Sequence, residues 1–187
     1  GIRGSRVGYP LFDTGAPKIL RFKGGRGHTG SVGVRGAYSR VWSGYSALCL
    51  AKGLSSDGVL HTIELREDDA KKAIDYFNKA GYEKKIIVHT GNALDIAGAL
   101  NEIWDLVFID ADKPGYIDYF NLVFPDVRKN GFILADNIFF HGQVLQQEVK
   151  GKNAKAIMAF NQFIKDRSDI DKVALTIRDG LYLIRKL

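Results

Sequence analysis

The stretch Trp104-Asp105-Leu106-Val107-Phe108-Ile109-Asp110 is a nearly continuous run of apolar side chains that ends in a carboxylate. Such a run is typical of a parallel strand that is buried on both faces of a sheet. A second run, residues 131–135, has the same character and is followed by Asp136-Asn137. Both runs therefore predict interior strands of an α/β sheet, each with an acidic residue at its carboxyl end.

Helical and strand patterns alternate on either side of these two runs. Further strands are predicted at 59–64, 85–89, 172–177 and 181–185, and helices at 45–54, 67–80, 93–100, 116–127 and 153–167. The Asp179-Gly180 pair between the last two strands is a strong hairpin signal. We therefore expect a mostly parallel sheet with helices on both faces and an antiparallel hairpin at its end. Ligands of such sheets bind beyond the carboxyl ends of the strands.

The first 42 residues differ from the rest of the chain in composition. The chain has 187 residues and a net charge of +6, and residues 1–42 hold eight of its 27 Lys and Arg side chains, one of its 21 acidic side chains and ten of its 21 glycines. Glycine at this density raises the entropy cost of ordering a chain. We therefore divide the chain into an atypical basic segment, residues 1–42, and a regular domain, residues 43–187. The basic segment is either a flexible arm or the product of a sequence error.

Several classes of protein are disfavoured by the composition. No apolar run approaches the ~20 residues that span a bilayer, and no secretory signal is visible. The single cysteine, Cys49, lies on an apolar stretch, which fits a buried and inert thiol in a reducing cytoplasm. We expect a cytoplasmic protein that has no membrane partner.

Asp110, Asp136 and Asn137 are candidate metal ligands. Adjacent strands lie ~4.8 Å apart, so carboxylates at the ends of two neighbouring strands can converge on one cation. An all-oxygen set of two carboxylates and one amide carbonyl suits Mg²⁺, with Ca²⁺ or Mn²⁺ as alternatives. The other interpretation is that each side chain caps the helix that follows it.

Two further charged residues have a possible chemical role. Glu64 ends a predicted strand, where an acid can accept hydrogen bonds from ribose hydroxyls, although it could instead cap the helix that begins near Glu67. Lys113 lies three residues after Asp110. A lysine beside a cationic site can act as a general base, but most lysines are solvated surface residues.

The remaining candidates carry weaker signals. Gly44 would let a cofactor approach the backbone, or would merely open a helix, and Gly91-Asn92-Ala93 would reach an adenine or form a simple turn. Phe139, Phe140 and His141 would line the pocket of a flat aromatic substrate or belong to the core, with His141 the weaker candidate for a base. We assign Asp112 to a local turn and Tyr116 to core packing.

The order and spacing of these motifs resemble the caffeoyl-CoA and catechol O-methyltransferase family, which is cation-dependent. The resemblance covers residues 43–187 and does not extend to residues 1–42. It is carried by Phe108-Ile109-Asp110-Ala111-Asp112-Lys113, Tyr116, Ala135-Asp136-Asn137, His141-Gly142, Thr62-Ile63-Glu64, Gly91-Asn92-Ala93 and Arg178-Asp179-Gly180-Leu181.

The resemblance implies a seven-stranded, Rossmann-like class I methyltransferase fold and a homodimer. It implies that Asp110, Asp136 and Asn137 hold the divalent metal and that Lys113 is the catalytic lysine. With the weaker candidates included, the residues assigned to S-adenosylmethionine are Gly44, Glu64, Asn92, Ala93 and Asp110. The implied reaction is methyl transfer from S-adenosylmethionine to a hydroxyl of a small o-dihydroxy aromatic, after the metal and Lys113 have helped to remove the hydroxyl proton.

The chain departs from the family at its first strand. The family has an acid, then one residue, then a glycine at the end of that strand, whereas the matching positions here hold Tyr38 and Arg40. Three hypotheses therefore remain: an O-methyltransferase of small catechols, a methyltransferase of a hydroxylated RNA base whose phosphates contact residues 1–42, or a non-catalytic module that binds the cofactor. A nicotinamide dehydrogenase is disfavoured because no Gly-x-Gly-x-x-Gly motif follows a strand.

Overall fold

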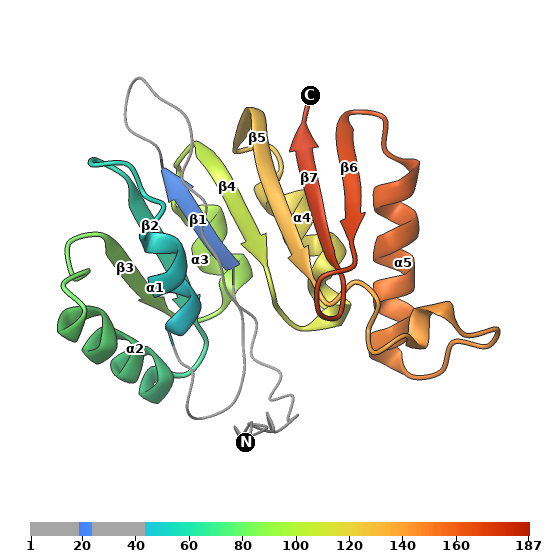
Figure 1. Ribbon diagram of the computed structural model, residues 1–187, viewed down its shortest axis with the longest axis horizontal. Helices are drawn as coiled ribbons and strands as arrows, with labels where there is room; N and C mark the ends of the chain where they lie inside the picture. The colour runs from blue at the N-terminus through green and yellow to red at the C-terminus, as the bar shows by residue number, and fades with distance from the viewer. Residues whose placement is uncertain (1–18, 24–43) are drawn as a thin grey trace, which may run out of the picture.

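The computed structural model describes residues 19–23 and 44–187. These residues form one seven-stranded sheet in the order β3-β2-β1-β4-β5-β7-β6 (Figure 1). The strands are β1 (Ile19–Lys23), β2 (Val59–Glu64), β3 (Ile86–Thr90), β4 (Trp104–Ile109), β5 (Val127–Asp136), β6 (Ile170–Leu175) and β7 (Leu181–Lys186). The helices are α1 (Tyr45–Ala51), α2 (Glu67–Lys79), α3 (Ala93–Ala99), α4 (Tyr116–Val123) and α5 (Lys152–Asp166), with short 3-10 turns η1 (Lys113–Gly115) and η2 (Gln143–Leu145).

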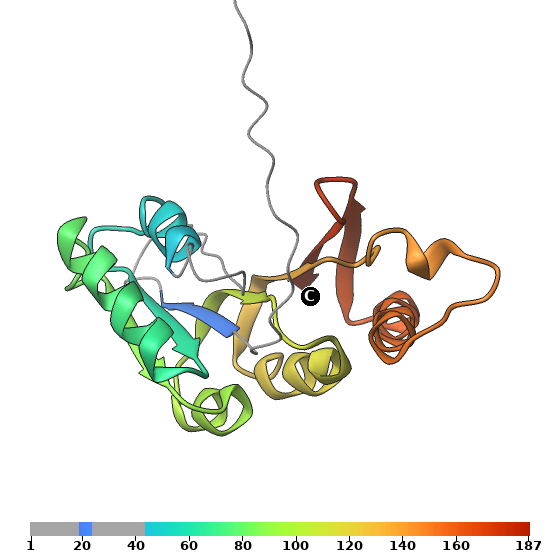
Figure 2. The same cartoon turned by 90° about the horizontal axis from the view of Figure 1, so that it is seen from below.

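Helices cover both faces of the sheet (Figure 2). One apolar cluster joins the sheet to α1 and α2, and the other joins it to α3, α4 and α5. Strand β4 contributes Leu106 and Phe108 to the first cluster and Val107 and Ile109 to the second. Side chains of a strand alternate between its faces, so the apolar run of β4 is explained by burial on both sides, as predicted. No helix in the described part of the chain is long and apolar enough to cross a membrane.

The Rossmann-like arrangement and the C-terminal hairpin are confirmed. Strands β2 and β3 are parallel, as are β4 and β5, and β7 is antiparallel to both β5 and β6. The hairpin turn at Arg178-Asp179-Gly180 uses positive φ angles at Arg178 and Gly180, of which the angle at Gly180 costs little because glycine has no Cβ.

The expectation of a mostly parallel sheet is wrong at its centre. Strand β1 is antiparallel to both β2 and β4, so four of the six strand pairings in the described sheet are antiparallel. Its first residue, Ile19, pairs with Ile109, and its last, Lys23, pairs with Val59. The last residue of β1 therefore lies beside the start of β2, at the opposite end of the strands from Glu64 and Asp110. An antiparallel ladder satisfies the backbone groups of β2 and β4 as fully as a parallel one.

Strand β1 lies within the basic segment, residues 1–42, where no strand was predicted from the sequence. Its sequence, Ile19-Leu20-Arg21-Phe22-Lys23, alternates apolar and basic residues from Leu20 onward. Alternation with a period of two is the signal of a strand, but five residues beside a glycine-rich stretch gave too short a pattern to stand out. The positions that the family resemblance assigned to the first-strand turn, Tyr38 and Arg40, lie outside the described residues.

The boundary between α4 and β5 differs from the prediction. The helix ends at Val123, and the strand begins at Val127, four positions before the predicted start. Pro125 lies between them, and proline cannot continue a helical hydrogen-bond ladder. The amine of Lys186 donates hydrogen bonds to the carbonyl oxygens of Phe124, Pro125 and Val127 and so fixes this connection.

Cys49 is exposed, which contradicts the expectation of a buried thiol. Helix α1 buries Ser46, Ala47 and Ala51. With 3.6 residues per turn, position 49 lies on the other side of the helix from Ala47 and Ala51. The apolar character of the stretch therefore did not identify which face of the helix is buried.

Candidate active site

Asp110 and Asp136 lie at the carboxyl ends of neighbouring strands. Strands β4 and β5 are hydrogen-bonded, and their register pairs Ile109 with Ala135, the residues that immediately precede the two acids. Both aspartates are buried. The condition on which the predicted metal site depended, that the two strands are neighbours, is therefore met.

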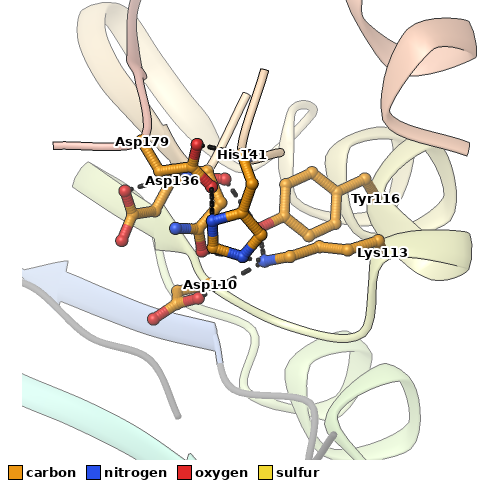
Figure 3. Close-up of polar contacts among 7 residues, drawn as sticks. Asp110, Lys113, Tyr116, Asp136, His141 and Asp179 are labelled. Carbon is orange, nitrogen blue, oxygen red and sulfur yellow. Dashed lines mark hydrogen bonds and ion pairs between the residues drawn. The ribbon is translucent and has the colours of Figure 1, made fainter. Parts of the chain in front are cut away.

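Lys113 is part of this buried group rather than a surface lysine, since only 8% of the residue is exposed. Its amine donates hydrogen bonds to the hydroxyl oxygen of Tyr116 at 2.7 Å and to Oδ1 of Asn137 at 3.1 Å. It also forms an ion pair with Oδ1 of Asp110 at 3.5 Å (Figure 3). The lysine thus connects the ends of β4 and β5, and its solvated interpretation is ruled out.

Tyr116 contacts this buried group through its hydroxyl, whereas the role expected for it from the sequence was core packing. Its ring is fully buried and packs edge-on against Phe160, at 5.2 Å between ring centres, as core packing predicts. Its hydroxyl, however, donates a hydrogen bond to the backbone carbonyl of Asp136 at 2.9 Å while accepting one from Lys113. Its position three residues after Lys113 and its place in the family motif were visible in the sequence, but neither indicates where the hydroxyl points.

Asn137 occupies a left-handed backbone conformation with φ of 58°, which asparagine tolerates better than most residues. Its backbone N–H donates to Oδ1 of Asp136 at 2.9 Å, and its side-chain oxygen faces the amine of Lys113. The turn at the end of β5 therefore directs both an amide oxygen and a carboxylate to the edge of the sheet.

The donor set fits a hard divalent cation. Two carboxylates and one amide oxygen come from adjacent strand ends, and the two acids with Lys113 have a summed formal charge of −1. Hard oxygen donors and residual negative charge suit Mg²⁺ or Ca²⁺. The described residues contain no group of three or more His, Cys, Asp or Glu side chains that could hold a metal, so a site here depends on the Asn137 oxygen.

Asp112 has a structural role that agrees with its assignment to a turn. It caps η1 by accepting the N–H of Gly115 at 3.2 Å, and it accepts the hydroxyl of Tyr119 at 2.6 Å. Burial, and then the hydrogen bond and charge of Asp112, raise the pKa of Tyr119. These contacts hold Asp112 to the turn and away from the proposed ligand set.

The loop after β5 is attached to the β6–β7 hairpin by Asp179. The carboxylate of Asp179 accepts the backbone N–H of His141 at 2.6 Å, and the imidazole Nδ1 lies 3.7 Å from its second oxygen (Figure 3). Phe139 packs so closely on Gly180 that an added Cβ would lie 2.5 Å from Phe139 Cδ2. The backbone of His141 is therefore fixed by Asp179, while its imidazole remains exposed.

The residues assigned to the cofactor fall into two groups. Glu64 is buried at the end of β2, and its backbone carbonyl accepts the N–H of Gly91 at 2.9 Å, which joins the ends of β2 and β3. Helix α2 has Arg66 as its N-cap and no side-chain cap, so the capping interpretation of Glu64 is wrong. Asn92, by contrast, caps α3 by accepting the N–H of Leu94 at 2.8 Å, and Ala93 is buried as the first residue of that helix.

Gly44 has a packing requirement of its own. It precedes α1 with φ of 88°, and an added Cβ would lie 2.7 Å from Phe77 Cε1. Glycine is needed here for both the backbone conformation and the close approach of α2. This explains the residue without a ligand, and its assignment to the cofactor stays a prediction.

Comparison with known proteins identifies the family of this chain. The sequence profile of a family described as O-methyltransferase matches residues 38–187. The chain belongs to the O-methyltransferase family. The matched region begins five residues before the predicted domain and includes every site residue discussed above.

Two relatives show the kind of protein involved. The chain is 32% identical over 153 residues to a probable caffeoyl-CoA O-methyltransferase 1 of Dictyostelium discoideum, with 79% of this chain and 66% of that protein covered. It is 31% identical over 137 residues to a catechol O-methyltransferase of Niastella koreensis, with 71% and 62% covered. The chain therefore spans slightly less than two thirds of the length of these curated relatives.

Solved structures of other O-methyltransferases share the fold. The O-methyltransferase TomG of Streptomyces achromogenes, in complex with S-adenosylmethionine, superposes with a TM-score of 0.72 at 28% identity, covering 78% of this chain and 69% of that one. The O-methyltransferase of Bacillus cereus, in complex with S-adenosylhomocysteine, gives 0.72 at 29% identity, covering 78% and 70%. The class I methyltransferase fold is thus shown.

Proposed function

We propose that this chain is an S-adenosylmethionine-dependent O-methyltransferase that uses a divalent cation and acts on a small aromatic substrate with two adjacent hydroxyls. One observation carries the proposal: Asp110, Lys113, Asp136 and Asn137 meet in one buried group at the carboxyl ends of β4 and β5. A set of oxygen ligands with a lysine amine among them suits the deprotonation of a hydroxyl.

The residues of the site have separable tasks in this proposal. Asp110, Asp136 and Asn137 would hold the cation, which would supply the Lewis acidity that makes a phenolic hydroxyl easier to deprotonate. Lys113, after losing its own extra proton to solvent, would take the proton from that hydroxyl as a neutral amine, since its amine lies within the same buried group. Burial of the acids and the lysine excludes water and strengthens their electrostatic interactions.

The methyl donor would bind at the carboxyl ends of β2 and β3, on the same side of the sheet as the proposed metal site. Glu64 would accept hydrogen bonds from its ribose hydroxyls, and the start of α3 at Asn92-Ala93 would contact its adenine. The buried position of Glu64 at the end of β2, beside the end of β3, supports this assignment. The complexes of two similar proteins with S-adenosylmethionine or S-adenosylhomocysteine support the identity of the donor.

The aromatic acceptor would lie against the loop after β5. Phe139 and Phe140 follow the proposed metal ligands after Ile138, and Asp179 fixes the path of the loop through His141. Two adjacent oxygens on an aromatic ring match a chelating site, because both can reach one cation. The Niastella koreensis relative is a catechol O-methyltransferase, which favours a catechol as the first substrate to test.

The experiment is transfer of a radiolabelled methyl group from S-adenosylmethionine to catechol by the purified chain, with Mg²⁺ present. Parallel reactions with 3-methoxyphenol, which has one free hydroxyl, test the need for two adjacent hydroxyls, and reactions with RNA test the nucleic-acid alternative. Label in catechol alone supports the proposal. Label in RNA alone, or cofactor binding with no transfer to any acceptor, would contradict it.

A further inference from the structure

The hydroxyl of Tyr116 connects the proposed base to the backbone of the proposed metal ligands. It accepts a hydrogen bond from the amine of Lys113 and donates one to the carbonyl of Asp136. A phenol has one proton and can accept through its oxygen. Donation to the carbonyl therefore fixes the direction in which the oxygen accepts, and that direction is toward Lys113 (Figure 3).

Among the described residues, three acceptors face the amine of Lys113: Tyr116, Asn137 and Asp110. An ammonium has three donors, so these acceptors define its position. Two of them, Asn137 and Asp110, belong to the oxygen set proposed for the cation. An oxygen that coordinates a cation is a poorer acceptor for a second positive group. The Tyr116 oxygen is the shortest contact and the one outside that set.

We infer that Tyr116 is a positioning residue. Its hydroxyl holds the Lys113 amine at the carboxyl ends of β4 and β5, where the substrate is proposed to bind, and it does so without help from the metal ligands. The inference rests on the proposed function in that Lys113 is taken as the base of that reaction. Its geometric part rests on the contacts alone. The ring is anchored by burial against Phe160, so the hydroxyl is a rigid support, whereas the flexible lysine stem provides none of its own.

The test is the variant Tyr116→Phe, which removes one oxygen atom and keeps the buried ring. Tyr119→Phe is the matched control, because Tyr119 lies one turn later on α4, is also buried, and donates its hydroxyl to Asp112 instead. Tyr116→Phe is expected to lower kcat roughly 10- to 100-fold, the value of one hydrogen bond to a charged group. KM for S-adenosylmethionine should not change, and Tyr119→Phe should keep kcat near that of the wild type.

A double-mutant cycle separates positioning from a merely structural role. If Tyr116 acts through Lys113, adding Tyr116→Phe to Lys113→Ala should cause no further loss of kcat. Equal additional losses in both backgrounds would overturn the inference. A loss of kcat in Tyr119→Phe as large as in Tyr116→Phe would also overturn it. Loss of any hydroxyl that supports η1 would then explain the lower kcat, without a specific role for Tyr116.

Crystal structures of the wild type and of Tyr116→Phe, each with and without Mg²⁺, give a result that does not depend on turnover. We expect the Lys113 amine to stay within hydrogen-bonding distance of the Tyr116 hydroxyl in both wild-type crystals and to leave this position in the variant. An amine that keeps its position without the hydroxyl would overturn the inference. If instead the wild type transfers no methyl group, the proposed function fails while this structural test still decides the role of Tyr116.

Discussion

The amine of Lys113 lies 3.5 Å from a carboxylate oxygen of Asp110, and both side chains are buried at the end of β4. A lysine and an aspartate three residues apart are common on protein surfaces, where such a pair contributes little to stability. Here the pair is joined by the Asn137 oxygen from the neighbouring strand. A buried polar group at the carboxyl ends of two neighbouring strands supports the proposal that this is the active site.

Lys113→Ala should lower kcat for methyl transfer by about 10²–10⁴-fold, the usual contribution of a general base. Its amine lies among the oxygens proposed for the cation and the substrate, so the dissociation constant of S-adenosylmethionine should change little. Steady-state kinetics and calorimetry measure the two quantities. Lys150→Ala is the control, because Lys150 is exposed and forms an ion pair with the exposed side chain of Glu148. Unchanged kcat in Lys113→Ala would remove the lysine from the mechanism.

Gly180→Ala should destabilise the fold and disturb the loop after β5. Gly180 has φ of 83°, and an added Cβ would lie 2.5 Å from Phe139, so backbone strain and overpacking together should cost about 2–4 kcal/mol. Gly81→Ala is the control for strain alone, because Gly81 has φ of 73° and no atom within 4 Å of an added Cβ. Its cost should be about 1 kcal/mol.

Urea unfolding of both glycine variants gives the free energies directly. Equal losses for Gly180→Ala and Gly81→Ala would mean that Phe139 moves aside freely. The loop that is proposed to face the aromatic substrate would then not be held by the hairpin in the way the contact with Gly180 implies.

Stability should fall in mild acid because of His89. Burial lowers the pKa of His89 below its ordinary value of 6.5, and its ring stacks on that of His61 with 3.0 Å between Nε2 of His89 and Nδ1 of His61. The unfolded state therefore binds a proton at a higher pH than the folded state. The free energy of unfolding should be constant well above pH 6.5 and decrease as the pH falls below it.

The variant His89→Gln tests this dependence, because glutamine keeps a polar side chain but does not titrate. The slope of unfolding free energy against pH between pH 7 and pH 5 should be smaller in the variant than in the wild type. An identical slope in both proteins would show that other groups cause the acid sensitivity.

The chain as written should bind S-adenosylmethionine weakly. The family has glycine where this sequence has Arg40, a position outside the described residues, and a side chain there would intrude on the cofactor. Arg40→Gly should recover only part of the affinity, because the segment before it does not resemble the family. Calorimetry on protein whose residues 1–42 have been verified by mass spectrometry measures this. Micromolar binding by the unaltered chain would make the basic segment a working variant and refute a sequence error.

Much of the site could be predicted because apolar strands have a clear pattern in the sequence. The runs that end at Asp110 and Asp136 showed that both acids come after buried strands, and parallel strands place such ends at one edge. The alternation that β1 shows over Leu20-Arg21-Phe22-Lys23 indicates a strand but carries no information on its direction. The direction of a strand depends on how it pairs with its neighbouring strands, and the residue pattern of the strand itself does not show this.

Other features depend on single atoms and so were beyond prediction. Tyr116 was expected to pack in the core, and its ring does so, but the role of its hydroxyl depends on where the Asp136 carbonyl lies in space. For Gly44 and Asn92, the sequence allowed both a structural and a functional interpretation and could not decide between them. The exposure of Cys49 depends on which side of α1 faces the sheet.

The most direct test of metal-dependent methyl transfer measures the rate at which label passes from S-adenosylmethionine to catechol. The rate is measured with Mg²⁺ present, after a chelator has removed Mg²⁺, and after Mg²⁺ has been added back. We predict that transfer stops on chelation and resumes with added Mg²⁺. Asp136→Ala should show no response to Mg²⁺, whereas Asp171→Ala, at an exposed ion pair on β6, should respond as the wild type does. Methyl transfer that continues undiminished in the presence of the chelator would contradict the proposed role of Asp110, Asp136 and Asn137.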